Sequence, residues 1–379
     1  MKDLGLNIYY GFLHVLVCIT SIIFVTTTIG LNLPLAFLSV AMGIIVFRLM
    51  TKAKLPAVLG VSGAYVSGMI AVGTTHGAGF VAGGVILSGI IYLIFGFLMK
   101  KFPRVMSLFP NYILSLAIIC ISLTLIPIGI DVFKANPIIG AITILCAMII
   151  QAIPKLSMLT MPIALGVGTL AQWWMFGLES SNQATELLFT TPQFNLYSFS
   201  LIGVVALAVI FETIADTRNM AIASGVDIDS EVGLHRVVMG NGIATVISGA
   251  MGGQPLTTYS ENTGFLYLTK WTNPNAQIFT ALIFVAMAFI PQIPQLIGYI
   301  PMASFGAILV YLFSLILVSN IKELELKDEK MSRVATITVA LFFIAPEVVP
   351  QVSPIAVAML GAVIVNKLIK GGASDGDSK

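Results

Sequence analysis

The sequence predicts an all-α polytopic membrane protein whose fourteen transmembrane segments form two inverted repeats of seven segments each. Three observations carry this prediction. Hydrophobic residues make up 58% of the 379 residues and charged residues only 9%, whereas soluble domains have about 25% charged residues. The basic residues collect on one side when the apolar segments are threaded alternately through a membrane. Two short, interrupted segments occupy matching places in the two halves of the chain.

Apolar segments with short connections account for most of the chain. A helix needs about 20 apolar residues to cross a bilayer, and the third and the tenth segments are clearly shorter than this. The fourteen segments are expected at residues 11–29, 33–49, 63–75, 78–99, 107–127, 136–152, 156–177, 199–217, 237–250, 260–270, 275–297, 300–319, 333–348 and 352–369.

The distribution of positive charge supports this number of segments. Cytoplasmic loops of membrane proteins carry an excess of Lys and Arg. With the N-terminus inside, only Lys134 of the 19 Lys and Arg residues falls outside, and a wrong number of segments would scatter these charges over both sides. We therefore expect a multi-pass protein of the cell's inner (plasma) membrane with both termini in the cytoplasm.

The chain is organised around residues 254–270, which read Q-P-L-T-T-Y-S-E-N-T-G-F-L-Y-L-T-K. An extended-looking run opens this stretch, and the helix-compatible part that follows is too short to cross a bilayer. Non-helical backbone survives at membrane depth only where protein or a water-filled cavity satisfies its polar groups. Transporters use such broken helices to present backbone groups to a solute, so we predict a binding site here.

The third segment repeats this plan. The stretch 55–65 carries Pro56, then small and β-tolerant residues, and leads into another short helix-compatible run. Because each half contains an odd number of segments, the halves insert with opposite orientation, which predicts inverted repeats with the site at their interface. The alternative is that Gly60 and Gly63 only ease the packing of helices.

Three carboxylates, Glu212, Asp216 and Glu261, lie within or beside apolar segments. An ionised carboxylate at the centre of a membrane helix costs about 2.5–3.5 kcal/mol on insertion scales, so we expect these groups to pair, to bind or to carry protons. Glu212 and Asp216 are four residues apart and share a helix face. One of them is therefore expected to be protonated or paired with Arg218 or His14.

Each of these groups leaves two readings open. Glu212 is the candidate proton carrier, because burial favours the neutral form of a carboxyl group; a structural hydrogen bond to unwound backbone is the alternative. Asp216 is expected to have a structural or ion-binding part. His14 is expected to be a hydrogen-bonded core histidine or, alternatively, a proton carrier.

Other classes of protein are disfavoured. The sequence has no nucleophile–base constellation, no His/Cys metal-ligand spacing and no phosphate-binding loop, which argues against an enzyme and against a bound metal or resident cofactor. No basic tract is interleaved with aromatic residues, so no nucleic-acid partner is expected. Cys18, Cys120 and Cys146 lie within apolar runs and predict buried thiols rather than disulfides.

Residues 261–264 read Glu-Asn-Thr-Gly, and after four more residues Thr269 and Lys270 follow. This spacing matches the signature Q/E/P-N-X-G, four variable residues, T, then R/K/G. The chain therefore resembles the nucleobase–ascorbate transporters, the second nucleobase–cation symporter family, and within it the uracil/xanthine permease type. The segment spacing extends the resemblance over essentially the whole chain, and further agreement lies at 55–60, 233–249 and 257–264.

The resemblance implies a division of the fold into two domains. Segments one to four and eight to eleven would form a core, five to seven and twelve to fourteen a gate, and short antiparallel strands in segments three and ten would meet at the site. Family members are typically homodimers that move the core against the gate, an elevator-like motion. The expected parts are core 1–105 and 199–298, gate 106–198 and 299–370, and a disordered cytoplasmic tail 371–379.

The resemblance also implies the residues of the site. Glu212 corresponds to the acidic residue of segment eight that hydrogen-bonds the base, Glu261 to the residue of segment ten that binds its opposite edge, and Gly63 to the position of segment three whose backbone helps to hold it. A carboxylate accepts paired N–H bonds from a uracil or purine ring, and such charge-assisted bonds are strong. The remaining expected substrate-binding residues are Tyr65, Tyr259, Ser260 and Asn262, and the expected proton-coupling residues are Glu212, Asp216 and His14.

The chain mixes features of two groups of the family. Glu261 resembles uracil-type members, whereas Asp216 four residues after Glu212 resembles purine- and ascorbate-type members. The expected function is import of a nucleobase, uracil or a purine such as xanthine, by symport of H⁺ or alternatively Na⁺. An ascorbate or inorganic-anion transporter of the same architecture is the alternative, which two deep carboxylates and the lack of a central basic residue argue against. Small residues scattered through 300–319 predict a homodimer contact along 305–315.

Overall fold

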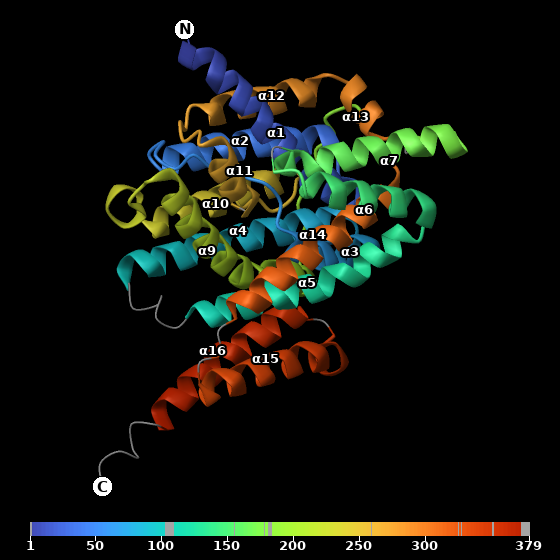
Figure 1. Ribbon diagram of the computed structural model, residues 1–379. Helices are drawn as coiled ribbons and strands as arrows, with labels where there is room; N and C mark the ends of the chain where they lie inside the picture. Colours follow the sequence, from blue (N-terminus) through green and yellow to red (C-terminus); the bar gives the residue numbers. More distant parts are fainter. Residues whose placement is uncertain are drawn as a thin grey trace.

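The computed structural model describes residues 2–102, 110–154, 156–177, 179–180, 184–258, 260–324, 326, 328–350 and 352–372. Helices make up most of these ranges, and a single isolated bridge is the β-structure among them (Figure 1). An all-helical fold was expected from the apolar composition, because only helices and closed barrels satisfy their backbone polar groups in lipid.

Every expected segment of the first half coincides with a helix. Two of them, the third and the seventh, begin with a turn of 3₁₀-helix. The helices are α1 (Lys2–Ile29), α2 (Leu33–Met50), η1 (Gly63–Tyr65) with α3 (Val66–His76), α4 (Ala78–Lys101), α5 (Asn111–Phe133), α6 (Pro137–Gln151), and η3 (Ser157–Leu159) with α7 (Thr160–Phe176).

The expected segments of the second half also coincide with helices. One of them, 275–297, is split in two at Ile290 and Pro291, because a proline lacks the N–H donor and holds the residue before it in an extended conformation. The elements are α8 (Leu196–Ser198), η4 (Phe199–Gly203), α9 (Ala206–Ser224), η5 (Ile228–Val232), α10 (Leu234–Ala250), α11 (Ser260–Thr269), α12 (Ala276–Phe289), α13 (Gln292–Ile297), α14 (Met302–Glu323), α15 (Glu329–Val348) and α16 (Pro354–Gly372).

Seven helices of the described chain are long and apolar enough to cross a membrane, judged by length and composition, and three further apolar helices are shorter. The last helix, α16, includes the first two residues of the expected tail, and residues 373–379 lie outside the described part of the chain. The seven long candidates are 3–29, 33–50, 78–101, 112–133, 196–224, 302–322 and 329–348.

Helix starts follow from local sequence. The side chain of Asn32 accepts a hydrogen bond of 2.9 Å from the backbone N–H of Leu35, and a proline occupies the first turn of α2. Asn136 caps α6 in the same way, and Pro137 is its first residue. An Asn cap satisfies an N–H group that has no partner inside the helix, and proline loses nothing there because its missing N–H would be unpaired.

Two extended segments interrupt the helices and meet inside the protein. Residues 55–62 connect α2 to η1, and residues 252–258 connect α10 to α11. Gly60 and Thr257 form an antiparallel bridge in which each backbone N–H donates to the other carbonyl over 3.0 Å. The two interrupted segments therefore come together as predicted, although within the described residues they pair at this one position rather than as longer strands.

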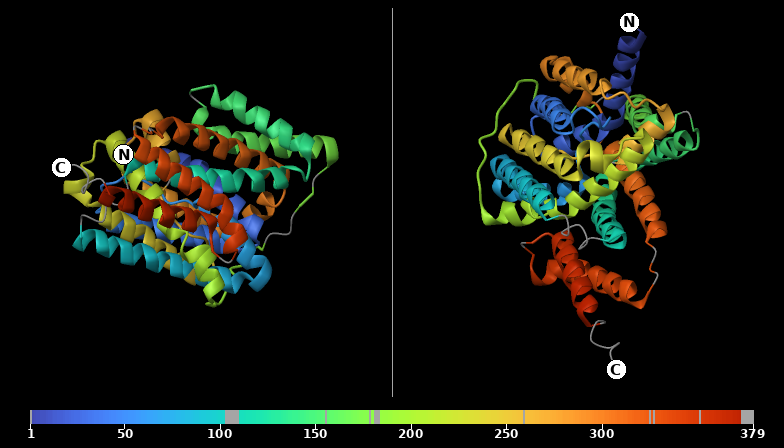
Figure 2. Two further views of the ribbon diagram at one scale, coloured as in Figure 1. Left: turned by 90° about the horizontal axis from the view of Figure 1, so that it is seen from below. Right: turned by 90° about the vertical axis from the view of Figure 1, so that its left-hand side faces the viewer.

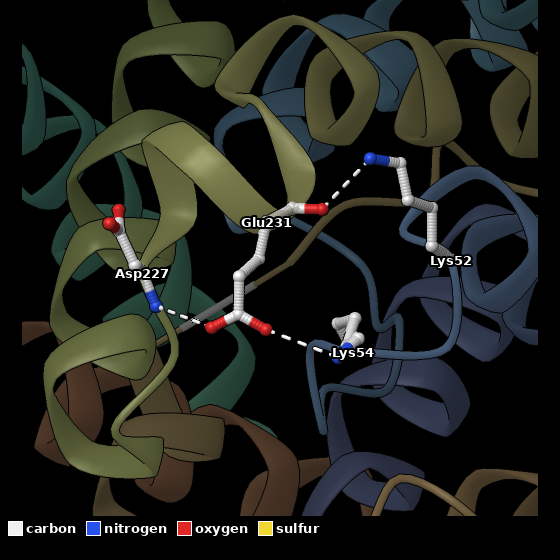
Figure 3. A network of polar contacts seen from close by, with 4 residues as sticks. All are labelled: Lys52, Lys54, Asp227 and Glu231. Carbon is white, nitrogen blue, oxygen red and sulfur yellow. Dashed lines mark hydrogen bonds and ion pairs between the residues drawn. The ribbon is translucent and has the colours of Figure 1, made fainter.

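An ion pair and a hydrogen bond connect η5 to the turn after α2, a second hydrogen bond connects η5 to the residue before it, and together they hold the start of the first extended segment (Figure 3). We call this set of contacts the loop tie. The ammonium group of Lys54 lies 3.2 Å from the Glu231 carboxylate, and that of Lys52 donates to the Glu231 backbone carbonyl over 2.9 Å. The backbone N–H of Asp227 donates to the same carboxylate over 3.2 Å. The hydrogen bond from this N–H is the largest cause that holds the pKa of Glu231 below its ordinary value, and Lys54 is the second. Both favour the charged form of the carboxyl group.

The helices pack as two groups, each of which draws on both halves of the chain (Figures 1 and 2). In the first group α10 packs against α2 and α4, and α12 packs against α1 and α2. In the second group α14 packs against α5, α6 and α7, and α15 packs against α16. The hairpin of α15 and α16, red in the figures, lies at the edge of the molecule and contacts α5 and α9.

Part of the predicted homodimer contact along 305–315 faces the inside of the protein. Phe305, Ala307, Ile308 and Leu309 are at most 5% exposed within the single chain, because α14 packs against three helices of its own group. Small residues in this helix serve packing inside the protein: a side chain at Gly306 would collide with the backbone of α5. The homodimer itself stays a prediction.

Candidate functional site

A cavity lies between the two groups of helices, at the end of the first extended segment. We call it the central cavity. Its volume of about 70 Å³ is several times the roughly 10–15 Å³ that one buried water needs, so it has room for a small solute. It is lined by Thr20, Ser21, Phe24, Val25, Val61, Ser62, Gly63, Met161, Glu212, Phe305, Ile308, Leu309, Leu312, Phe313 and Ile316.

Glu212 contributes the carboxylate of this cavity. It projects from α9 and accepts a hydrogen bond of 3.0 Å from the hydroxyl of Ser62. Ser62 also caps η1, because its hydroxyl oxygen accepts from the backbone N–H of Ala64 over 3.3 Å. The break in the third segment therefore fixes the position of the carboxylate. The side chain remains half-buried and faces a space where a solute can approach it.

Gly63 lies close to side chains of the second group of helices. A Cβ atom placed on it would lie 2.5 Å from the ring of Phe313 and 2.7 Å from the side chain of Leu125. These residues belong to α14 and α5 of the second group. A side chain at this position would therefore require the ends of the Phe313 and Leu125 side chains to shift.

A buried polar network lies behind the Gly60–Thr257 bridge. The hydroxyls of Thr213 and Thr257 are 2.8 Å apart, and the side-chain amide of Asn241 donates to both over 3.3 Å. The hydroxyl of Tyr92 joins them from α4, 3.3 Å from Thr213 and 3.4 Å from Thr257. Helices α4, α9 and α10 are thus tied to the second extended segment, while Asn241 Oδ1 has no hydrogen-bond partner within the described residues.

Side chains of α11 and α12 hold the backbone of the first extended segment. Asn262 donates to the Val58 carbonyl over 2.9 Å and accepts from its N–H over 3.2 Å. The amide of Gln277 donates to the carbonyls of Leu55, over 2.9 Å, and Ala57. Non-helical backbone is costly away from water unless it is paired, and these amides supply the partners that a continuous helix would have provided.

The second extended segment is satisfied in the same manner. Thr26 of α1 donates to the side-chain oxygen of Gln254 over 2.7 Å, and Ser248 donates to the Gln254 backbone carbonyl over 2.6 Å. The hydroxyl of Thr245 donates to the carbonyl of Leu256 and accepts from its N–H. Both segments are therefore fixed from several helices before any solute binds.

The structure places both Glu212 and Gly63 at the wall of the central cavity, and their role in binding a substrate stays a prediction. Tyr65 and Asn262 lie elsewhere: Tyr65 is buried with its hydroxyl 2.7 Å from that of Ser88, and Asn262 is 0% exposed against Val58. Tyr259 lies outside the described residues, as do the side chains of Ser260 and Glu261.

The two remaining expected proton-coupling residues are buried away from the central cavity. Asp216 lies one helical turn after Glu212 and is 4% exposed. His14 is buried on α1 with its ring 3.8 Å from that of Phe265, centroid to centroid. Within the described part of the chain, His14 Nδ1 has no hydrogen-bond partner, and the roles expected of His14 stay predictions.

Sequence reasoning missed Ser62 and the face of α14 that lines the cavity. Ser62 lies at the junction of the extended run and the third helix. This position was the sequence feature that could have marked it as a site residue. The apolar residues of α14 that line the cavity recur at helical spacing, but in a membrane protein such a stripe equally well faces lipid.

The chemistry of the cavity favours a neutral solute that carries N–H donors. Its described lining has one carboxylate, three hydroxyl groups and otherwise apolar groups, with no basic side chain among them. The described His, Cys, Asp and Glu residues do not gather in groups of three that suit a metal ion.

Comparison with known proteins decides the family. The model of the permease family matches residues 6–353. The chain belongs to this family. The resemblance to nucleobase–ascorbate transporters is thereby confirmed, and the protein is a transporter rather than an enzyme.

Curated relatives of this permease carry the names of several nucleobases. It is 29% identical to the uracil permease of Bacillus caldolyticus over 82% of this chain and 78% of that protein. It is 25% identical to the uric acid permease PucJ of Bacillus subtilis over 73% of this chain and 66% of that protein. The xanthine permease of the same organism is 24% identical over 72% of this chain and 66% of that protein.

Solved structures share the fold of this permease. The transmembrane domain of the cyanobacterial bicarbonate transporter BicA superposes with a TM-score of 0.71, covering 97% of this chain and 98% of that one, at 14% identity. The structure of SLC26A9 gives a TM-score of 0.73, covering 98% of this chain and 66% of that one, at 12% identity.

Proposed function

We propose that this permease is a secondary active transporter that imports a nucleobase, uracil or a purine such as xanthine, by proton symport. The observation that carries the proposal is the Glu212 carboxylate, which Ser62 holds at the wall of a cavity without a described basic side chain. Adjacent N–H groups of a nucleobase ring can donate to such a carboxylate, and charge-assisted bonds of this kind are about twice as strong as neutral ones. The names of the curated relatives support the same class of substrate.

The packing of helices supports two inverted repeats of seven transmembrane segments. Under such a repeat, segment n of one half corresponds to segment n + 7 of the other. Helices α4 and α10 are the fourth and ninth segments, so their contact corresponds to that of the eleventh and second segments, α12 and α2. Helices α6 and α7 are the sixth and seventh segments, so their contact corresponds to that of the thirteenth and fourteenth, α15 and α16. All four pairs pack together. On this reading the shorter helices also cross the membrane, as parts of broken segments.

The two groups of helices would act as core and gate. The core would comprise 1–105 and 199–298, the gate 106–198 and 299–370. The central cavity lies where α1, the first extended segment and α9 of one group face α14 of the other. A solute held mainly by the first group would be carried across when that group slides against the gate, an elevator-like motion. The positive-inside distribution supports termini in the cytoplasm of a cell's inner membrane.

Protons are the proposed coupling ion, because Glu212 is a protonatable group inside the cavity. Sodium is the alternative, with Asp216 as its suspected ligand. Ascorbate or an inorganic anion is less suited, since an ionised Glu212 would repel it and no basic residue of the described lining would attract it. The shared fold with anion transporters at such low identity says nothing of the substrate.

Uptake into liposomes tests the proposal. Purified permease should accumulate radiolabelled uracil or xanthine, with competition from related bases and none from ascorbate or sulfate. Accumulation should rise when the external side is acidic and collapse with a protonophore. Uptake of sulfate or ascorbate alone would overturn the substrate, and sodium-driven uptake insensitive to the protonophore would overturn the coupling ion.

A further inference from the structure

A second cavity adjoins the central cavity; we call it the side cavity. Met161 and Leu312 line both. The side cavity has a volume of about 210 Å³, three times that of the central cavity. It is lined by Val17, Gln151, Ser157, Thr160, Met161, Gly264, Phe265, Leu268, Tyr311, Leu312 and Leu315.

The two groups of helices supply different chemistry to this space. From the proposed core, α1 and α11 contribute apolar groups, including the ring of Phe265. The proposed gate contributes polar groups: the Thr160 hydroxyl donates to the side-chain oxygen of Gln151 over 3.0 Å, and the Tyr311 ring stands on α14. The Thr160 hydroxyl also lies 2.7 Å from the Ser157 carbonyl. Gln151 thus offers the side cavity an amide, which can donate to or accept from a planar solute.

Neither close packing nor backbone conformation requires a glycine at position 264. It lies inside α11, where glycine is less favourable than alanine, and its φ is outside the left-handed region that favours glycine. A Cβ atom placed on it meets nothing within 4 Å, in contrast to the crowded Gly63. Gly264 is exposed and lines the side cavity.

We propose that the side cavity is a transit site for the nucleobase between the central cavity and the cytoplasm, and that Gly264 keeps it wide enough for the ring to pass. This inference rests on the proposed function. The positive-inside pattern places Lys270, just after α11, on the cytoplasmic side, and Leu268 of the same helix end lines the side cavity. The ligand class is a flat heterocycle, which aromatic rings flank and an amide recognises.

A graded series at Gly264 tests the inference. Gly264→Ala and Gly264→Leu insert side chains of increasing size into open space, so both should fold with an unchanged or higher melting temperature in detergent. Gly264→Leu should slow exchange of labelled uracil across liposomes by about tenfold or more, and exchange of the larger xanthine further, while equilibrium binding changes less than about twofold. Gly264→Ala should lie between wild type and Gly264→Leu.

Gly166 provides a matched control. It also lies inside a helix, α7, and a Cβ atom placed on it likewise meets nothing within 4 Å, but it lines neither cavity. Gly166→Leu should therefore bind and exchange like wild type. If Gly264→Leu fails to fold, the rates of Gly264→Ala for uracil and xanthine decide the question.

Three outcomes contradict the inference in different ways. Equal exchange rates for wild type, Gly264→Leu and Gly166→Leu would remove the side cavity from the pathway. A loss of equilibrium binding in Gly264→Leu that matches its loss of exchange would place Gly264 in the central site instead. Failure of the wild type itself to bind or exchange any nucleobase would overturn the proposed function and, with it, the transit site.

Discussion

Asn262 pairs its side-chain amide with both backbone groups of Val58, which lies in the other half of the chain. The amide completes the hydrogen bonding of an extended segment in the way that a neighbouring strand would. Asn262 is 0% exposed and belongs to the signature that marked the chain as a permease. In this structure the asparagine builds the site through the backbone that it holds.

The first prediction concerns this bond. Asn262→Leu keeps the volume of the side chain and leaves the N–H and C=O of Val58 buried without the amide. Each unpaired group costs about 1–3 kcal/mol, so the melting temperature should fall clearly, and binding should weaken along with it. Thr263→Val is the control, because within the described chain the Thr263 hydroxyl has no hydrogen-bond partner. An Asn262→Leu protein with unchanged stability and no binding would instead make Asn262 a direct ligand.

The second prediction concerns the support of the carboxylate. Ser62→Ala removes the hydroxyl that donates to Glu212. Hydrogen bonds to charged groups contribute about 1.5–3 kcal/mol, and part of this is recovered when water replaces the hydroxyl, so nucleobase affinity should fall about tenfold. Ser21→Ala lines the same cavity but removes a hydroxyl that bonds to its own helix, at the carbonyl of Cys18; its affinity should match wild type. Isothermal titration of both variants provides the comparison.

The third prediction separates binding from coupling at Glu212. Glu212→Gln keeps the shape of the side chain and removes its titratable proton. If Glu212 carries the symported proton, accumulation against a gradient should disappear, whereas counterflow, which needs no net proton movement, should persist with weakened binding. Gradient-driven uptake and counterflow in the same liposomes make the test. Persistent acid-driven accumulation by Glu212→Gln would assign the proton to another group.

The fourth prediction concerns Glu261, whose side chain lies outside the described residues. If its carboxylate accepts N–H bonds from the base, Glu261→Gln replaces one acceptor with a donor that faces a donor. An unpaired buried group costs about 1–3 kcal/mol, which lowers affinity roughly tenfold to a hundredfold, and the loss should be smaller for xanthine than for uracil. Direct binding of each base to purified protein is the measurement. Equal affinity of wild type and variant for every base would remove Glu261 from the site.

The fifth prediction concerns pH and the loop tie of Figure 3. The pKa of Glu231 is lowered in the folded protein, so its contribution to stability is present above the ordinary value of 4.5 and is lost as the pH falls through the lowered folded value. Glu231→Gln should therefore lower the melting temperature at neutral pH by a small amount. The difference from wild type should shrink as the pH falls below that ordinary value and vanish below the lowered folded value. Asp229→Asn, an exposed change in the same turn, should show no such convergence. A difference that is constant with pH would mean that the tie is not ionic.

The positions of the helices could be predicted from the sequence because local chemistry sets them. Asn32 and Asn136 with their neighbouring prolines mark helix starts, and the prolines at 56 and 255 mark the extended segments. The meeting of those segments followed from their matching places in the two halves. Their pairing at one position did not, because the length of a β-contact depends on which side chains from other helices, such as Gln277, take over the remaining backbone groups.

The hydrogen-bond partner of each polar residue could not be predicted from the sequence. Tyr65, Asn262 and Ser62 all lie in or beside the two interrupted segments, yet one bonds to Ser88, one to Val58 and one to Glu212. Which polar group faces a cavity depends on the rotation of each helix, and in an apolar sequence every face looks alike. The same ambiguity placed inward-facing residues of α14, such as Phe305 and Ile308, in the predicted dimer contact.

The bridge between Gly60 and Thr257 has a consequence for biogenesis. Translation delivers the first half long before the second, so the backbone at residues 55–62 enters the membrane without its later partners, Thr257, Asn262 and Gln277. Unpaired backbone is unstable in lipid, and such a nascent chain must keep this stretch near water or near the insertion machinery until the tenth segment emerges. A chain released between the halves would therefore keep the backbone of residues 55–62 without these partners.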